Sequence, residues 1–438
     1  MSRPLEFDDA SRPVSLNAWR TIIWTIFGCT MILPLFKERR FDAPHIITFF
    51  GFSDTHIEAA SLWGGRLALI AYSLLAAHLL WSWWRTRRFD LSGRLILYGA
   101  MAPCFALLLS SIFGTNPAFA PPVIVWPALF LAFWLIPTPN AEWWRLELRL
   151  AGRVLAASSI LALIIVPTWA ADANYAGIIP GFQFRLAGFT IHSNTLGPFM
   201  ALALIIELHS KLKWSSVGFV LAELCVLMLT QSKTSLIMAA VALPLCLAST
   251  SCVIPRLAPA TRLALVAWLW ATGLSVGLIA MNSISDAGAD TAGVDTFTGR
   301  TYIWQAVLDE WRDNIVFGYG PRIWDESMQQ RLEPIIGFRA LHSHNQFVEL
   351  LGMCGVIGFL AWLWFIASLV TSVSRFASPH RTECFCFLIV MMIGGVSEPW
   401  FTTYGFIGAP WLLIIYCHLI VLCRQNPSPP NVLVHGPG

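Results

Sequence analysis

The chain has 438 residues, of which 56% are hydrophobic and only 12% are charged, and its mean hydropathy is +0.65. Soluble domains carry about a quarter charged residues, so this composition excludes an ordinary soluble protein. The net charge of +3 is too small to argue for a nucleic-acid partner. The 21 tryptophans and 29 phenylalanines suit a protein surrounded by lipid, with aromatic rings at its interfaces.

Apolar runs along the chain predict an all-α polytopic membrane protein with about twelve transmembrane helices, because about 20 apolar residues cross a bilayer. The expected spans are 18–36, 59–84, 95–113, 118–137, 154–172, 193–209, 214–230, 235–255, 263–282, 345–373, 383–399 and 405–423. Prolines interrupt the fourth run and several runs are short, so the count is twelve give or take one or two. The expected organisation is a cytoplasmic segment 1–17, transmembrane helices in 18–282, a large periplasmic loop 283–343, transmembrane helices in 344–424 and a disordered cytoplasmic tail 425–438.

Basic residues are sorted between the two sides of this arrangement. With the N-terminus in the cytoplasm, more than half of the 28 Lys and Arg residues fall in cytoplasmic segments, and each such segment holds at least one. This bias sets the orientation of membrane proteins and predicts that loop 283–343 lies outside the cytoplasm. The basic residues on the outer side run against the trend and favour an anionic partner there. They include Arg185, Lys233, Arg300 and Arg322.

The loop 283–343 is expected to contain short helices. Four apolar residues recur at helical spacing and predict an amphipathic helix lying along the membrane surface. They are Trp304, Val307, Leu308 and Trp311. Arg300 falls in the first turn, where free N–H groups and the helix dipole attract anions. Its planar guanidinium suits a phosphate or diphosphate, and a solvated arginine paired with Asp295 fits the residues about equally well.

Polar residues then lead back into the membrane. Tyr319 lies in a glycine-rich turn, and His342 and His344 stand at the outer end of the next span. We expect no metal site, because no third ligand at helical spacing accompanies the two histidines. An imidazole at this place suits a helix cap or a general base near neutral pH. Glu349, one turn further, is expected to orient His344 or to bind a substrate hydroxyl.

Small residues and cysteines carry structural interpretations. Gly352, Gly355 and Gly358 are three residues apart, which favours close helix packing in lipid. None of the 10 cysteines falls in 283–343, which excludes a disulfide framework in that loop. The cysteines are expected to be helix filler.

Three stretches resemble the O-antigen ligase/polymerase family of bacterial glycan enzymes. The first is Gly299-Arg300-x-x-x-Trp304 followed by Gly318-Tyr319-Gly320; the second is His344-Asn345, nine residues, then Gly355-x-x-Gly358. The third is the segment 185–194, which begins with Arg185 and ends with Asn194. The core resemblance runs from about 180 to 400. Lys233 departs from the pattern, because the family usually has an arginine there, and a lysine lacks the bidentate fork.

The resemblance implies a metal-independent, inverting glycosyltransferase of the membrane-embedded, GT-C-like type that needs no cofactor. The donor would be a glycan on undecaprenyl diphosphate, the acceptor a glycan or lipid A-core, and the place the periplasmic face of a bacterial inner membrane. Arg300 and Arg185 would hold the diphosphate, while His344 would deprotonate or orient the attacking hydroxyl. The expected substrate contacts are Asn345, Glu349, His342, Asn194, Lys233, Arg322 and Tyr319. A flippase and a chain-length regulator are candidate protein partners.

The family contains polymerases, which join repeat units, and ligases, which move finished chains to lipid A-core. Gly-Tyr-Gly followed shortly by Ile323-Trp324 resembles the exopolysaccharide polymerases more closely, so polymerisation is the favoured reading. A lipid-linked glycan transporter is the alternative of another class. It is disfavoured because the two halves of the chain show no matching broken helices.

Overall fold

The computed structural model is mostly helical, as the apolar runs predicted. It describes residues 12–36, 54–86, 91–173, 175, 179, 182–210, 214–248, 300–336, 339–376, 380–403 and 409–425. The first helices are α1 (Arg12–Phe36), α2 (Asp54–Thr86), α3 (Arg94–Phe113), α4 (Pro122–Leu135), α5 (Ala141–Ile165) and α6 (Pro167–Ala170). A two-stranded antiparallel ribbon follows, formed by β1 (Ala171–Asp172) and β2 (Arg185–Leu186).

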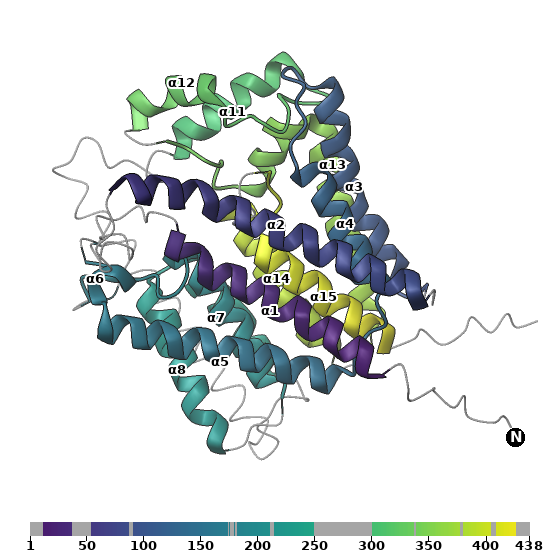
Figure 1. The fold of residues 1–438 in the computed structure, drawn as a ribbon, viewed down its shortest axis with the longest axis vertical. Coiled ribbons are helices and arrows are strands. Elements are labelled where there is room, and N and C mark those ends of the chain that lie inside the picture. Colours follow the sequence, from purple (N-terminus) through teal and green to yellow (C-terminus); the bar gives the residue numbers. More distant parts are fainter. Residues whose placement is uncertain are drawn as a thin grey trace, which may run out of the picture.

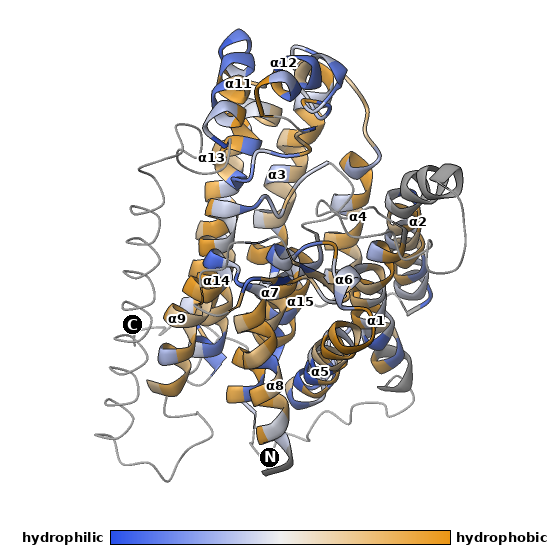
Figure 2. Cartoon of the chain, turned by 90° about the vertical axis from the view of Figure 1, so that its left-hand side faces the viewer, coloured by the Kyte–Doolittle hydropathy of each residue, from blue (hydrophilic) through white to orange (hydrophobic). Residues whose placement is uncertain are grey.

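The second half of the described chain is again helical. Three apolar helices come first, namely α7 (Ser193–Leu208), α8 (Trp214–Thr230) and α9 (Lys233–Ala248). The remaining helices are α11 (Arg300–Asp313), α12 (Glu326–Ile336), α13 (Gln346–Ser374), α14 (His380–Ser397) and α15 (Ala409–Gln425). α11 and α12 lie together at one end of the molecule (Figure 1), and Figure 2 shows that this end is richer in hydrophilic residues than the helices below.

Among the residues that the structure describes, six helices are long and apolar enough to cross a membrane, which supports a polytopic membrane protein. They are α1, α2, α3, α5, α13 and α14, while α4, α7, α8, α9 and α15 are shorter apolar helices. The prediction of twelve full spans is therefore confirmed only in part. One physical reason is visible at α4, which begins at Pro122 because proline lacks an N–H and suits the first turn of a helix. The expected span 263–282, Asp295, most of segment 1–17 and nearly all of the tail 425–438 lie outside the described residues.

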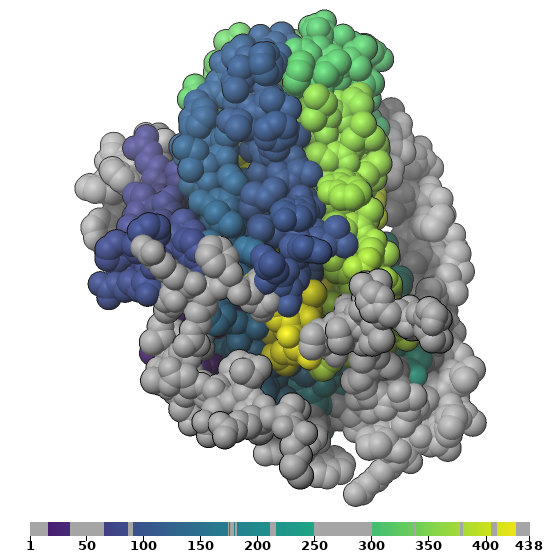
Figure 3. Space-filling model, turned by 90° about the vertical axis from the view of Figure 1, so that its right-hand side faces the viewer, coloured from purple at the N-terminus to yellow at the C-terminus, as the bar shows by residue number. Residues whose placement is uncertain are grey.

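α3 and α13 form the long spine of the molecule. Figure 3 shows them side by side, below the end that carries α11 and α12. Their close approach depends on Gly99 of α3, where an added Cβ would lie 1.8 Å from the Oγ of Ser368. Buried aromatic rings fill the interior beside this pair, with the Phe130 and Tyr416 ring centroids 4.7 Å apart.

α13 is broken near its outer third, at Gly355, and the loop after α11 is docked into the break. Gly355 has φ 61° and ψ −159°, a backbone conformation that favours glycine. The N–H groups of Val356 and Ile357 donate to the carbonyls of Ile315 and Val316 instead of to their own helix. In return, Tyr319 N–H donates to the carbonyl of Gly352 at 2.8 Å.

The expected role of the glycines in α13 therefore needs a correction. An added Cβ at Gly355 would lie 2.4 Å from the carbonyl oxygen of Val316, and one at Gly352 would lie 2.4 Å from Val307 of α11. These glycines admit the loop and α11, rather than a neighbouring membrane helix. Gly358 faces Cys354 of its own helix.

Candidate functional site

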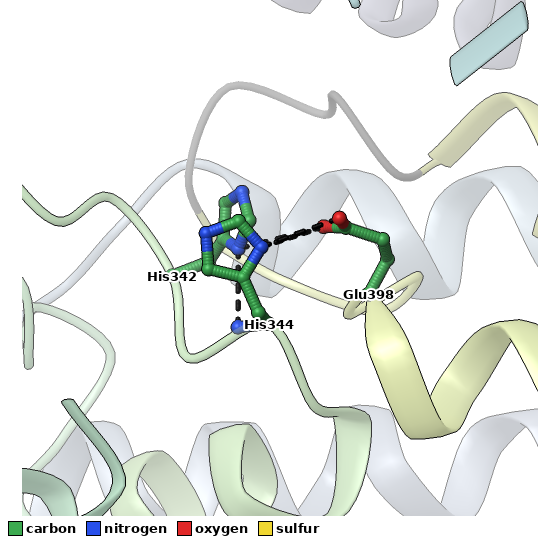
Figure 4. A group of neighbouring side chains, drawn as sticks. All are labelled: His342, His344 and Glu398. Carbon is green, nitrogen blue, oxygen red and sulfur yellow. Dashed lines mark hydrogen bonds and ion pairs between the residues drawn. The ribbon is translucent and has the colours of Figure 1, made fainter. Parts of the chain in front are cut away.

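The candidate site is centred on His344 and Glu398. His344 Nδ1 lies 3.2 Å from both carboxylate oxygens of Glu398. His342 Nδ1 lies 3.8 Å from Glu398 Oε2, and Figure 4 shows both imidazoles beside that carboxylate. His342 and His344 precede α13, whereas Glu398 directly follows α14, so the site forms where these two helices meet.

The backbone of His344 is held in an unusual conformation. Its φ is 55°, a region that non-glycine residues rarely adopt. Hydrogen bonds on both sides maintain it: His344 N–H donates to His342 Nδ1 at 3.2 Å, and Ser343 Oγ donates to the carbonyl of Asn345 at 2.7 Å. Such strain persists only where the surroundings fix it, and it is commonest at functional sites. The fixed backbone conformation therefore sets the direction of the His344 imidazole.

Asn345 begins α13 as its N-cap. Its Oδ1 accepts from the N–H groups of Phe347 and Val348, and its Nδ2 donates to the carbonyl of Val396 at 3.1 Å. Both polar atoms are thus used within the protein. A direct substrate contact by Asn345 stays a prediction, and within the protein the side chain ties the start of α13 to the end of α14.

Arg185 and Asn194 join the site from β2 and the start of α7. Asn194 Nδ2 donates to Glu398 Oε1 at 2.8 Å, and Asn194 Oδ1 accepts from the guanidinium of Arg185. Arg185 Nε donates to the carbonyl of Thr230 at 3.1 Å, which fixes the arginine against the end of α8. Asn194 is a bridge between a cation and the central carboxylate, so it positions its neighbours.

Arg300 approaches the same carboxylate from α11. Its guanidinium lies 3.9 Å from Glu398 Oε1 and keeps 20% of its side-chain surface exposed. It occupies the first residue of α11, as the sequence predicted. Burial lowers the pKa of Arg185, and the nearby charge of Arg300 adds to that effect. Two arginines held so close together would gain stability from an anionic ligand.

Electrostatics keep Glu398 ionised. Loss of water contact by itself would raise the pKa of the Glu398 carboxyl. The charge and hydrogen bond of His344, together with His342 and Arg300, outweigh this effect and hold that pKa well below its usual range. Glu398 is therefore a permanent acceptor opposite His344 Nδ1, which leaves Nε2 of the imidazole for other chemistry.

Two buried glutamines hold the loops that carry the charged groups. Gln346 Oε1 accepts from the N–H groups of Trp400 and Phe401, each at 2.7 Å, and its Nε2 donates to the Phe401 carbonyl at 3.0 Å. Because Gln346 and Trp400 are each two residues from the reactive pair, this clamp fixes Glu398 against His344. Gln231 holds the segment before Arg185 in the same way, donating to the carbonyl of Phe182 at 3.0 Å.

Glu349, expected to orient His344 or to bind a substrate hydroxyl, lies in the first turn of α13 beside the centre. It is fully buried, and its carboxylate accepts from Trp324 Nε1 at 2.9 Å, Ser343 N at 2.7 Å and Thr402 Oγ1 at 3.2 Å. No oxygen is left exposed for a substrate hydroxyl. The carboxylate accepts from the N–H of Ser343, the residue before His344, so it fixes the backbone that positions His344.

The remaining expected substrate contacts have other partners or are exposed. Tyr319 donates to Asp325 Oδ2 at 2.7 Å and accepts from Asn116 Nδ2 at 3.3 Å, in a cluster beyond the far end of α11. Arg322 is exposed on the following turn. Lys233 is exposed at the first residue of α9, next to Ser232, whose Oγ donates to Asn194 Oδ1 at 3.1 Å.

Three side chains of the centre have the composition of a metal site. His342, His344 and Glu398 each offer a ligand atom, and these atoms lie within 4.8 Å of one another. Glu398 supplies the third ligand that the sequence argument found missing. The adjacent Arg185 and Arg300 disfavour a bound cation, since like charges in a partly buried site repel.

Glu398 is the residue of the candidate site that sequence reasoning did not single out. It stands alone at the end of an apolar run, more than fifty positions from His344, with no motif around it. Its only signal is a carboxylate at the outer end of a span, where ionisable residues are usually functional.

The fold and site define a polytopic helical membrane protein with a histidine–carboxylate pair between two arginines. Residues 218–363 match the family model described as O-antigen ligase. The exopolysaccharide production protein ExoQ of Rhizobium meliloti (strain 1021) is 33% identical over 180 residues, which cover 38% of this chain and 40% of that protein. These matches support an O-antigen ligase/polymerase-type family and confirm the resemblance seen in the motifs.

The family match covers only part of the site. It includes His342, His344 and Arg300, but Arg185, Asn194 and Glu398 lie outside residues 218–363. The structure joins the two groups, because Glu398 contacts residues of both.

Proposed function

We propose that the protein is a membrane glycosyltransferase that acts on a glycan linked to undecaprenyl diphosphate and joins repeat units of an extracellular polysaccharide. The observation that carries this proposal is the His344–Glu398 pair at 3.2 Å, with Arg300 and Arg185 beside it. A base and a cationic anion site side by side are what transfer from a diphosphate requires.

The proposed step transfers one glycosyl group with inversion at the anomeric carbon. The acceptor hydroxyl oxygen forms a bond to that carbon while the bond from the carbon to the diphosphate oxygen breaks. The hydroxyl proton passes to His344 Nε2, and Glu398 stabilises the resulting imidazolium through Nδ1. The released polyprenyl diphosphate keeps the electron pair, and Arg300 and Arg185 stabilise its charge. No metal ion takes part in this scheme.

Polymerisation is favoured over ligation by the similarity to an exopolysaccharide production protein. Ligation to lipid A-core remains the second candidate, because the matching family model is described as O-antigen ligase. The positive-inside pattern supports a location in the bacterial inner membrane, with α11, α12 and the site facing the periplasm.

Reconstitution of the purified chain in liposomes tests the proposal. The only substrate is the undecaprenyl-diphosphate-linked repeat unit of the host, and the glycan is resolved on a gel. A ladder of longer chains, absent with Arg300→Ala or His344→Ala, is expected. Each variant must show the thermal transition of the parent protein.

Three other outcomes would each reject part of the proposal. Transfer that needs added lipid A-core would assign the ligase reaction. Movement of the lipid-linked glycan across the bilayer without a new glycosidic bond would assign a transporter. Normal ladders from either variant would remove that residue from the mechanism.

A further inference from the structure

An open groove lies between α5 and α8, and its lining shares no residue with the candidate site. Its cavity volume is about 420 Å³. The wall from α5 contains Ile160, Leu161 and Ile164, and the wall from α8 contains Gly218 and Phe219. Ile164 is 72% exposed, so the groove opens outward, toward the lipid that surrounds a membrane protein.

Two arginines lie at one end of this groove. Arg153 is the one charged residue in its lining; its guanidinium lies 4.4 Å from the ring centre of Phe219, and its Nε donates to Glu207 at 2.6 Å. Arg149 precedes it by one turn on the same helical face. Within the part of the chain that the structure describes, the buried Nε of Arg149 has no hydrogen-bond partner. The carboxylates of Glu207 and Glu223 lie near the same pair, and Ser216 accepts from Arg153 Nη2 at 3.2 Å. Arg153 keeps 20% of its side-chain surface exposed, so its remaining N–H groups are the donors that the groove offers to an anion.

The dimensions of the groove match one leaflet of a bilayer. At the rise of an α-helix, Ile164 lies about 16 Å beyond Arg153 along α5. Half of a hydrocarbon core of about 30 Å is similar to that length. A molecule with an anionic head at Arg153 and an apolar chain reaching Ile164 fits this arrangement.

We propose that the groove binds an anionic phospholipid of the leaflet on the Arg153 side, which is the cytoplasmic leaflet in the orientation proposed above. Its phosphate lies at Arg149 and Arg153, and one acyl chain lies on Ile160, Leu161 and Ile164. Basic pockets between membrane helices on that side are suited to lipid head groups. The isoprenoid tail of a donor fits less well, because its diphosphate would lie at the opposite end, beside Arg185.

Photo-crosslinking tests this assignment with the full chain in phosphatidylcholine vesicles. The probe is phosphatidylglycerol carrying a diazirine in one acyl chain, present as a minor component, and labelled peptides are mapped by mass spectrometry. Diazirine-bearing phosphatidylcholine and a diazirine-tailed polyprenyl diphosphate are run in parallel. Labelling by phosphatidylglycerol is expected to concentrate on α5 and α8.

Gly218→Leu is the variant that blocks the groove. An added Cβ at Gly218 meets no atom within 4 Å, so the larger side chain fills open space and the fold is retained. Gly65→Leu on α2 is the matched control, since a Cβ there also meets nothing within 4 Å. Arg149→Gln tests the head group, and loss of one guanidinium near the lipid surface is expected to lower the preference for phosphatidylglycerol about fivefold.

Loss of the α5 and α8 labels in Gly218→Leu, with the labels intact in Gly65→Leu, would support the proposal. Labels spread evenly over the lipid-facing helices, or unchanged in Gly218→Leu, would overturn it. Equal labelling by the two phospholipids would reject the anionic head group. Stronger labelling by the polyprenyl probe would assign the groove to the donor tail instead. None of these readouts needs catalysis, so they are independent of the proposed reaction.

Discussion

His344 Nδ1 lies 3.2 Å from each carboxylate oxygen of Glu398, although His344 precedes α13 and Glu398 follows α14, far apart in the sequence. The carboxylate faces one nitrogen of the ring and leaves the other free, which is the arrangement of a base oriented by an acid residue. Because α13 begins and α14 ends at this point, any shift between the two helices would change the distance between His344 and Glu398.

Removal of either member of this pair should reduce glycan formation by a similar factor. General-base catalysis contributes about 10²–10⁴-fold, so His344→Ala and Glu398→Gln are expected to lose a rate factor in that range. Their double variant should lose little more, because residues that act as a unit are not additive. The initial rate of glycan formation by purified protein measures this. His78→Ala and Glu333→Gln, both at exposed positions, are the matched controls. If the double variant lost the product of the two single rate factors, a shared role of the two residues would be contradicted.

The stability contributed by Glu398 should depend on pH in a defined direction. Its pKa in the folded protein is held below the ordinary value, which is about 4.3 in an unfolded chain. The contribution is therefore present above about pH 4 and is lost as the pH falls toward the folded value. Thermal unfolding of the parent and of Glu398→Gln should differ at pH 5 and converge progressively as the pH falls below 4. Convergence already at pH 6 would contradict the lowered pKa.

Gln346→Leu should make the site less rigid, while His344, Glu398 and the arginines stay in place. The change leaves two N–H groups and one carbonyl unsatisfied in a buried place, at about 1–3 kcal/mol for such a group. We expect a lower unfolding temperature and a lower kcat with little change in KM, since the arginines that hold the donor remain. Gln305→Leu on the exposed face of α11 is the control. A changed KM with normal kcat would mean that Gln346 acts on substrate binding.

Chelation should leave the activity unchanged if the histidines serve as base and orienting group. Protein incubated with a strong chelator and then desalted is expected to form glycan at the rate of untreated protein. The measurement separates the two mechanisms, because His342, His344 and Glu398 also have the composition of a metal site. Loss of activity that added Zn²⁺ restores would replace the acid–base mechanism with a metal-assisted one.

Gly355→Ala should destabilise the protein strongly. The residue has a positive φ, and a Cβ would lie 2.4 Å from the carbonyl oxygen of Val316. Strained backbone of this kind costs about 1–3 kcal/mol, and the displaced loop would add to it. The unfolding midpoint should fall, and protease should cut near 314–320 more readily. Gly28→Ala, where a Cβ meets nothing within 4 Å, is the control. Equal stability of the two variants would show that the break is not required.

The positions of the helices could be predicted best from the sequence, because a single physical signal determines each of them. Apolar runs placed most of the described membrane helices, because burial in lipid dominates their energetics. The amphipathic stripe placed the helix that begins at Arg300. The bounds of α3, α7, α8 and α13 agree with the expected spans to within one residue, whereas α5 begins at Ala141, well before the expected position 154.

Site residues were harder to predict, because a side chain's partners come from distant parts of the chain. Asn345 and Glu349 lie beside the centre as expected, yet caps and buried hydrogen bonds occupy their polar atoms. Tyr319 belongs to a separate cluster with Asp325. Glu398 carries no local pattern, and only the packing of α14 against α13 brings it to His344.

At the break in α13, the loop after α11 supplies the hydrogen-bond partners that the helix itself lacks. Two amides of α13 donate to the loop, and loop amides donate back to Gly352 and Met353, so neither segment completes its hydrogen bonds alone. Residues 315–320 should thus exchange their amide hydrogens as slowly as the neighbouring turns of α13, despite their irregular form. They should open only together with those turns. The outer segment that carries Arg300 and the membrane helix that follows His344 would then melt as one cooperative unit, and a perturbation at either end would be felt at the other.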